Sequence, residues 1–154
     1  MKHAPDIDHL IGFYHHLTPE SIACFPEFYS ADAYFKDPFN EVRGVEAIAH
    51  IFSHMFRQVD APRFVVTERV ADVHGVMLIW EFCYRVRRWG RGETQAIRGV
   101  SHLKFAADGK VNYHRDYWDA AEELYMKLPL LGRMMQCLKK LFACQVPDGW
   151  KKAN

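Results

Sequence analysis

Hydrophobic and polar residues alternate along the second half of the chain, with the period of two that is typical of β-strands. The alternation is clearest over residues 76–88, where one side carries Trp80, Phe82, Tyr84 and Val86 and the other carries Glu81, Cys83, Arg85 and Arg87. Further strand-like runs cover residues 64–73, 94–105 and 111–118, separated by His74-Gly75, Gly90-Arg91-Gly92 and Asp108-Gly109. Because such short glycine-containing segments favour tight turns, the pattern predicts four strands joined by hairpins.

The first half of the chain has the spacing of α-helices instead. Apolar residues fall on one side of a helix predicted over residues 7–17, and Gly44 precedes a second amphipathic run over residues 45–58. Between them, Thr18-Pro19-Glu20 predicts the start of a short helix over residues 21–29, and Pro26 predicts a kink or an early end. A short strand over residues 33–37 is closed by Pro38.

Helices followed by hairpin-linked strands indicate an α+β fold. We expect three N-terminal helices packed on a strongly curved, mostly antiparallel β-sheet, which leaves a cone-shaped pocket between the helices and the sheet. One such domain is predicted over residues 1–123, and a C-terminal helical extension is predicted over residues 124–154, packed on the domain or on a partner subunit.

Composition narrows the classes of function. The net charge of +1 gives no reason to expect a nucleic-acid partner. The four cysteines form no C-x-x-C pair, and His50 and His54 have no acid beside them as in H-E-x-x-H, so we expect neither a metal nor another cofactor. With no signal peptide or membrane-spanning run in the sequence, we expect a cytoplasmic protein.

The C-terminal segment has an unusual charge pattern. Residues 124–146 contain no acid but four basic side chains, and a broad apolar side that Pro129 and Gly132 interrupt. Two interpretations stay open at this point. The segment docks on the domain or on a second subunit, or it makes a weak contact with an anionic membrane surface as a basic amphipathic helix.

Two acids at predicted strand ends are the candidate catalytic residues. Asp37 lies in Phe35-Lys36-Asp37-Pro38-Phe39, and Asp116 lies in Tyr113-His114-Arg115-Asp116-Tyr117-Trp118-Asp119. Carboxylates held among aromatic side chains can serve as base and acid. The residues expected to bind the substrate are Tyr14, Phe13, Phe35, Trp80, Phe82, Tyr84, Ser101 and Trp118. Alternatively, Asp37 caps the turn at Pro38 and Asn40, Asp116 pairs with Arg98 or Arg115, and the aromatic residues form an ordinary core.

Two segments carry a family resemblance. Tyr29-Ser30-Ala31-Asp32-Ala33-Tyr34-Phe35-Lys36-Asp37-Pro38-Phe39 resembles the start of the ketosteroid isomerase branch of the nuclear transport factor 2-like superfamily. The stretch from His114 to Asp119, with Leu128-Pro129-Leu130, is similar to the end of limonene-epoxide hydrolase. The layout over residues 7–130 also resembles that of SnoaL-like polyketide cyclases.

The resemblance implies roles residue by residue. Asp37 falls on the isomerase base, Phe13 (beside Tyr14) on its oxyanion-hole tyrosine, and Ser101 on its oxyanion-hole aspartate. Asp116 falls on the hydrolase aspartate. The hydrolase's arginine and second aspartate are replaced by Glu81 and Cys83, or by Cys83 and Arg85.

We therefore expect a domain that binds a small apolar, oxygenated molecule. It would be a cofactor-independent isomerase, cyclase, hydrolase or dehydratase using carboxylate acid–base chemistry, or else a non-catalytic ligand-binding or protein-interaction module. An enzyme predicts both carboxylates in one cavity, whereas a binding module predicts one acid ion-paired or pointing away. Relatives of this kind commonly dimerise through the convex face of the sheet, which implies a homodimer.

Overall fold

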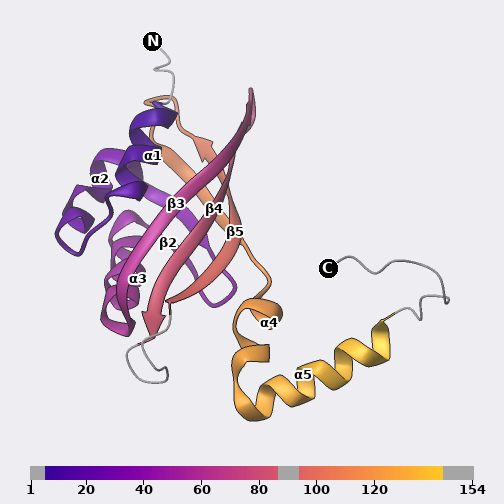
Figure 1. The fold of residues 1–154 in the computed structure, drawn as a ribbon. Coiled ribbons are helices and arrows are strands. Elements are labelled where there is room, and N and C mark those ends of the chain that lie inside the picture. The colour runs from indigo at the N-terminus through magenta and orange to yellow at the C-terminus, as the bar shows by residue number, and fades with distance from the viewer. Residues whose placement is uncertain (1–5, 87–93, 144–154) are drawn as a thin grey trace. The chain divides into compact units, whose positions relative to one another are not determined.

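The computed structural model describes residues 6–86 and 94–143, and it contains one six-stranded sheet with helices against it (Figure 1). The strands are β1 (Tyr29–Lys36), β2 (Glu41–Arg43), β3 (Val59–Asp72), β4 (Gly75–Val86), β5 (Thr94–Phe105) and β6 (Val111–Tyr117). The helices before or between them are α1 (Ile7–His15), the 3₁₀ turn η1 (Glu20–Cys24), α2 (Phe25–Phe28) and α3 (Val45–Gln58).

The strand order is β2-β1-β6-β5-β4-β3. Every neighbouring pair is antiparallel except β1 and β6, which run parallel. The curved sheet has α1, α2 and α3 on one face (Figure 1). The predicted α+β class is confirmed, and so is the order of the four long strands. The predicted turn at Gly90-Arg91-Gly92 lies outside the described residues.

Several element boundaries differ from the sequence-based expectation. The helix predicted over residues 21–29 is a 3₁₀ turn followed by the single turn of α2, because Pro26 at its N-terminus starts a new helix. Tyr29 already belongs to β1. The edge strand β3 begins at Val59, directly after α3, and accommodates Pro62 at a register irregularity between Asp60 and Arg63. The three-residue strand β2 has too short a pattern to predict.

The core lies between the helices and the sheet. Helix α1 contributes Leu10 and Tyr14, and α3 contributes Ile48 and Phe52. They pack against inward-facing strand residues that are at most 8% exposed: Tyr29, Ala33, Phe35, Val76, Leu78, Trp80, Phe82, Tyr84, Ile97, Leu103 and Val111. The alternation that predicted the strands therefore also identified their buried face.

The chain divides into two compact units, Met1–Trp118 and Asp119–Asn154. In the second unit, Asp119 caps α4 (Ala120–Glu123) by accepting from the backbone N–H groups of Ala121 and Glu122. The 3₁₀ turn η2 (Tyr125–Lys127) and helix α5 (Pro129–Phe142) follow. Leu130, Met134, Leu138 and Leu141 share one side of α5. Among the described residues, no helix is long and apolar enough to span a membrane.

Candidate functional site

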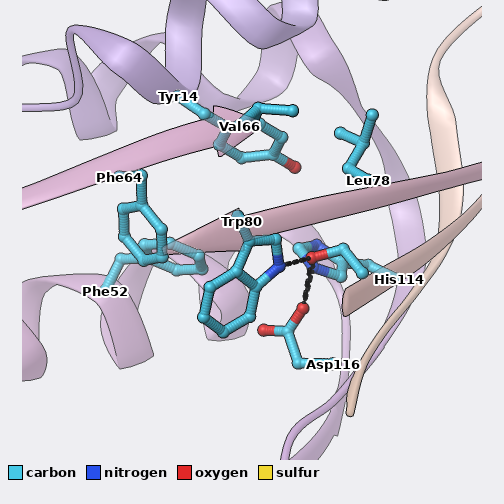
Figure 2. A pocket seen from close by; sticks show the side chains of 9 residues that line it. Tyr14, Phe52, Phe64, Val66, Leu78, Trp80, His114 and Asp116 are labelled. Carbon is cyan, nitrogen blue, oxygen red and sulfur yellow. Dashed lines mark hydrogen bonds and ion pairs between the residues drawn. The ribbon is translucent and has the colours of Figure 1, made fainter. Parts of the chain in front are cut away.

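A pocket opens between α1, α3 and the inner face of the sheet (Figure 2). Nine residues line it: Tyr14, Phe52, Phe64, Val66, Leu78, Trp80, Ser101, His114 and Asp116. Most of this lining is apolar, and the polar groups come mainly from β5 and β6. The pocket is therefore suited to an apolar molecule that presents a polar group to one wall.

Strand geometry brings the polar residues together. Leu78 and Trp80 are two residues apart on β4 and so share its inner face. His114 and Asp116 share the inner face of β6 in the same way. Ser101 lies between them on β5, paired with Leu78 on one side and with Asp116 on the other. Because all these positions face inward, the alternation on three adjacent strands concentrates the polar groups on one wall.

Helix α1 is held at the opposite wall by its contacts with β3. The ring nitrogen Nε2 of His15 accepts a hydrogen bond from the backbone N–H of Val66 at 2.9 Å. The β3–β4 register shifts between Val66 and Glu68, and such an irregularity leaves a backbone group unpaired for this contact. Two turns earlier in α1, Asp8 pairs with Arg69. Together these contacts hold Tyr14 over the pocket.

Asp116 is anchored through one carboxylate oxygen. Its Oδ1 accepts from the Ser101 hydroxyl at 2.5 Å and lies 2.8 Å from Nε2 of His114. The indole N–H of Trp80 donates to the same hydroxyl at 2.8 Å, and the dashed lines in Figure 2 trace this path. No group in the described part of the chain donates to Oδ2. The side chain is 15% exposed, so Oδ2 remains available to the pocket.

The hydrogen bonds continue behind His114. Its Nδ1 lies 2.7 Å from the hydroxyl of Tyr29, which lies 2.6 Å from the hydroxyl of Tyr14. Burial raises the pKa of both tyrosines well above the usual value, and the charge of Asp116 acts in the same direction. Both hydroxyls therefore keep their protons at neutral and moderately alkaline pH.

Four of the predicted site residues line this pocket, namely Tyr14, Trp80, Ser101 and Asp116. Asp37 is outside the lining. Its Oδ1 accepts from the backbone N–H groups of Phe39 at 2.7 Å and Asn40 at 2.6 Å, and the Asn40 side-chain amide contacts both carboxylate oxygens. This placement favours the turn-capping alternative for Asp37, because the turn after β1 uses its carboxylate.

The remaining predicted residues lie in the surrounding core rather than in the lining. Phe35 packs edge-on against His114 at 4.9 Å, and Phe13 stacks on Phe28 at 4.1 Å. Two stacked contacts place Phe82 between Phe64 (4.4 Å) and Tyr84 (5.2 Å). Trp118 meets Phe39 edge-on at 5.5 Å. Of these side chains, Phe35 and Phe82 support the pocket wall through the lining residues His114 and Phe64.

Five lining residues were not among the predicted site residues: Phe52, Phe64, Val66, Leu78 and His114. A signal for His114 was available, because it precedes Asp116 by two residues and so shares its strand face. The alternative in which Asp116 pairs with Arg98 or Arg115 is wrong. Arg98 pairs with Glu81 at 3.2 Å, and Arg115 lies over the ring of Tyr117. The partner of Asp116 is His114.

No group of three or more His, Cys, Asp or Glu residues that could hold a metal ion occurs within residues 6–86 and 94–143. The polar groups of the lining belong to five side chains. These are a carboxylate, an imidazole and three hydrogen-bonding groups from Ser101, Trp80 and Tyr14.

Comparisons with known proteins agree with this fold. The profile of the SnoaL-like domain matches residues 10–114. A protein from Jannaschia sp. that is named a SnoaL-like polyketide cyclase superposes with a TM-score of 0.66 at 14% identity, over 75% of this chain and 86% of that one. A similarly named protein from Shewanella putrefaciens gives 0.63 at 20% identity, over 81% and 100% of the two chains.

A third structure has the ketosteroid isomerase-like fold and was solved in complex with trimethylamine. This protein, from Catenulispora acidiphila, superposes with a TM-score of 0.64 at 14% identity, over 79% of this chain and 92% of that one. No curated protein matches the chain. At these identities the superpositions show the shared fold.

Proposed function

The chain belongs to the SnoaL-like domain family, and from that premise we propose that its pocket binds a small apolar, oxygenated molecule with which Asp116 exchanges a proton. The observation that carries the proposal is the one-sided anchoring of Asp116. Two donors engage Oδ1, while Oδ2 is left to a pocket whose other walls are mostly apolar. Such anchoring orients a general base while leaving its second oxygen for the ligand.

Neighbouring residues favour proton transfer on carbon or on a carbonyl group over activation of water. In the hydrolase that the sequence resembles, an arginine and a second aspartate accompany the catalytic aspartate. The corresponding residues of this chain are Glu81, Cys83 and Arg85. They are odd-numbered positions of β4, on the face opposite to the lining residue Trp80, and none of them is part of the lining. The reaction class that we propose is a cofactor-independent isomerisation, cyclisation or dehydration.

Hydrogen–deuterium exchange of a ligand tests the proposal without knowledge of the complete reaction. Small cyclic and aryl ketones that raise the melting temperature are incubated with the protein in D₂O, and loss of their α-hydrogens is followed by NMR. We expect Asp116→Asn to slow the exchange by about 10²–10⁴-fold while the ketone still binds. Asp32→Asn, on an exposed position of β1, is the matched control and should exchange at the wild-type rate.

Equal exchange rates in wild-type protein and Asp116→Asn would contradict the acid–base role. A second candidate function is non-catalytic binding of the same class of ligand. It is favoured by the placement of Asp37, because only one of the two expected carboxylates lines the pocket. Ligands that bind to the wild-type protein without any exchange of their α-hydrogens would support this candidate.

We also propose a homodimer formed through the sheet face opposite the helices. Ile79 and Val100 are neighbours in the β4–β5 register, and both are only partly buried although they are apolar. A partly buried apolar pair of this kind is suited to the centre of an isologous contact. Light scattering should give twice the chain mass for the wild-type protein and the chain mass for Ile79→Asp. A wild-type monomer at high concentration would contradict the proposal.

A weaker contact with an anionic membrane surface is proposed for α5. The apolar side defined by Leu130, Met134, Leu138 and Leu141 is accompanied by Arg133, Lys139 and Lys140, with no acid in the helix. A basic amphipathic helix of this composition binds anionic lipid through both its charge and its apolar side.

A further inference from the structure

One continuous line of hydrogen-bonding groups joins two walls of the pocket. It runs from the Tyr14 hydroxyl to the Tyr29 hydroxyl (2.6 Å), on to Nδ1 of His114 (2.7 Å), and from Nε2 of His114 to Oδ1 of Asp116 (2.8 Å). Tyr14 and Asp116 both line the pocket, whereas Tyr29 is 1% exposed and is not part of the lining. The middle of the line is thus enclosed by protein, and both of its ends face the ligand space.

The number of protons fixes the direction of every bond in this line. A tyrosine hydroxyl carries one proton, and a neutral imidazole carries one on either nitrogen. With Asp116 ionised and His114 neutral, Nε2–H donates to Asp116, so Nδ1 must accept from Tyr29. Tyr29 has then used its proton and must accept from Tyr14. In this state Tyr14 presents only lone pairs to the pocket.

One additional proton reverses the line. When Asp116 and His114 together hold two protons, one lies between Oδ1 and Nε2 and the other is on Nδ1. Nδ1–H then donates to Tyr29, Tyr29 donates to Tyr14, and the Tyr14 O–H is free to donate into the pocket. The hydrogen bonds from Trp80 to Ser101 and from Ser101 to Asp116 keep their direction. The Trp80 indole can only donate, and the Ser101 hydroxyl donates its own proton to Asp116.

We propose that Tyr29 and His114 couple the two ends of the pocket. When the Asp116–His114 pair holds one proton, Tyr14 accepts a hydrogen bond from the ligand. When the pair holds two protons, Tyr14 donates one. Tyr29 is then a positioning residue, because it acts on the pocket through Tyr14 and His114 and is not itself part of the lining. The use of this coupling in turnover rests on the proposed function, but the coupling itself is a property of the free protein.

The same line can deliver a proton to a bound oxygen. Tyr14 gives its proton to the ligand, Tyr29 replaces it, and Nδ1 of His114 replaces the proton of Tyr29. One O–H bond forms on the ligand, and the Asp116–His114 pair loses one proton, which returns Asp116 to a carboxylate with a neutral His114. The count of protons balances without any other donor.

Few other titratable side chains lie close enough to His114 to exchange a proton with it. The titratable side chains that face it are Tyr29 from β1, Tyr14 from α1 and Asp116 from its own strand. Phe35 covers an edge of the ring, and Ser101 lies 3.3 Å from Nε2. Because burial raises the pKa of both tyrosines, their hydroxyl protons persist at neutral and moderately alkaline pH.

NMR of the ligand-free protein labelled with ¹⁵N-histidine and ¹³Cζ-tyrosine tests the coupling. In the wild type, we expect the His114 nitrogens and the ring carbons of Tyr29 and Tyr14 to shift with one common midpoint as the pH falls. At the high-pH limit, the proton of His114 should reside on Nε2. In Tyr29→Phe, the Tyr14 shift at that midpoint should be lost, while His114 still titrates.

The matched control is Tyr34→Phe, which removes a hydroxyl bonded to Glu41 outside the line and should leave the common midpoint intact. A Tyr14 shift that persists in Tyr29→Phe, or a high-pH proton on Nδ1, would overturn the proposal. If Tyr29→Phe does not fold, Tyr14→Phe decides, because Tyr29 must still follow His114 there. Since no turnover is measured, failure of the proposed enzymatic function leaves this result unaffected.

Discussion

Replacing Gly99 by alanine is predicted to damage both the stability of the fold and the anchoring of Asp116. Gly99 faces Trp80 in the β4–β5 register. A Cβ atom at Gly99 would lie 2.4 Å, 2.5 Å and 2.9 Å from three carbon atoms of the Trp80 ring. Since ordinary contacts begin near 3.4 Å, the indole must move by about 1 Å. Its 2.8 Å hydrogen bond to Ser101 cannot survive such a shift.

The magnitude follows from two separate costs. Overpacking of a filled core costs about 1–3 kcal/mol. A buried N–H group left without a partner costs about 1–3 kcal/mol more. We therefore expect urea unfolding to show that Gly99→Ala loses about 2–6 kcal/mol, with an altered tryptophan emission in the folded state.

The chain offers a control with the opposite sign. A Cβ atom at Gly12, in the middle of α1, would meet nothing within 4 Å. Gly12→Ala should therefore raise the unfolding free energy by about 0.5–1 kcal/mol, because alanine restricts the unfolded chain and favours the helix. A Gly99→Ala protein within about 0.5 kcal/mol of the wild type would refute the proposed contact between Gly99 and Trp80.

Three further predictions concern the turn after β1, the buried tyrosines and α5. Asp37→Ala should lower the unfolding free energy by about 1–2 kcal/mol in urea titrations, because the N–H groups of Phe39 and Asn40 lose their acceptor; an unchanged value would contradict the turn-capping role. Because burial raises the pKa of Tyr14 and Tyr29 above the ordinary 10.0, their contribution to stability is complete below pH 10 and is lost as the pH rises further; tyrosinate absorbance should show these two of the seven tyrosines ionising only with unfolding. The full chain should sediment with phosphatidylserine vesicles, and Lys139→Gln with Lys140→Gln should weaken this binding roughly 30-fold; equal binding to neutral phosphatidylcholine vesicles would exclude the electrostatic contact.

Alternation along the strands accounts for most of what the sequence predicted about the site. It placed Trp80, Ser101 and Asp116 on inward faces, and hairpin signals placed their strands in order. It also contained the signal for His114, two residues before Asp116. These features are local, because a period of two and a short turn depend only on neighbouring residues.

The parts that local patterns did not predict depend on distant contacts. Tyr29 meets His114 only because β1 pairs in parallel with β6, and no periodicity specifies which strand β1 joins. Asp37 stands at a strand end, as a catalytic acid would. Whether its carboxylate faces a pocket or the N–H groups of its own turn depends on the backbone conformation after Pro38. Spacing along the sequence cannot distinguish these two outcomes.

The parallel pairing of β1 with β6 also has a consequence for how the protein is made. Tyr29 and His114 are 85 residues apart, so Tyr29 is synthesised long before its partner. The β3–β4 and β4–β5 hairpins can form as soon as their strands are complete, since their contacts are local. The pairing of β1 with β6 requires closure of a long loop and must wait for the last strand. The pocket is therefore among the last features to assemble, and a chain that ends before β6 would expose the aromatic side chains meant to surround it.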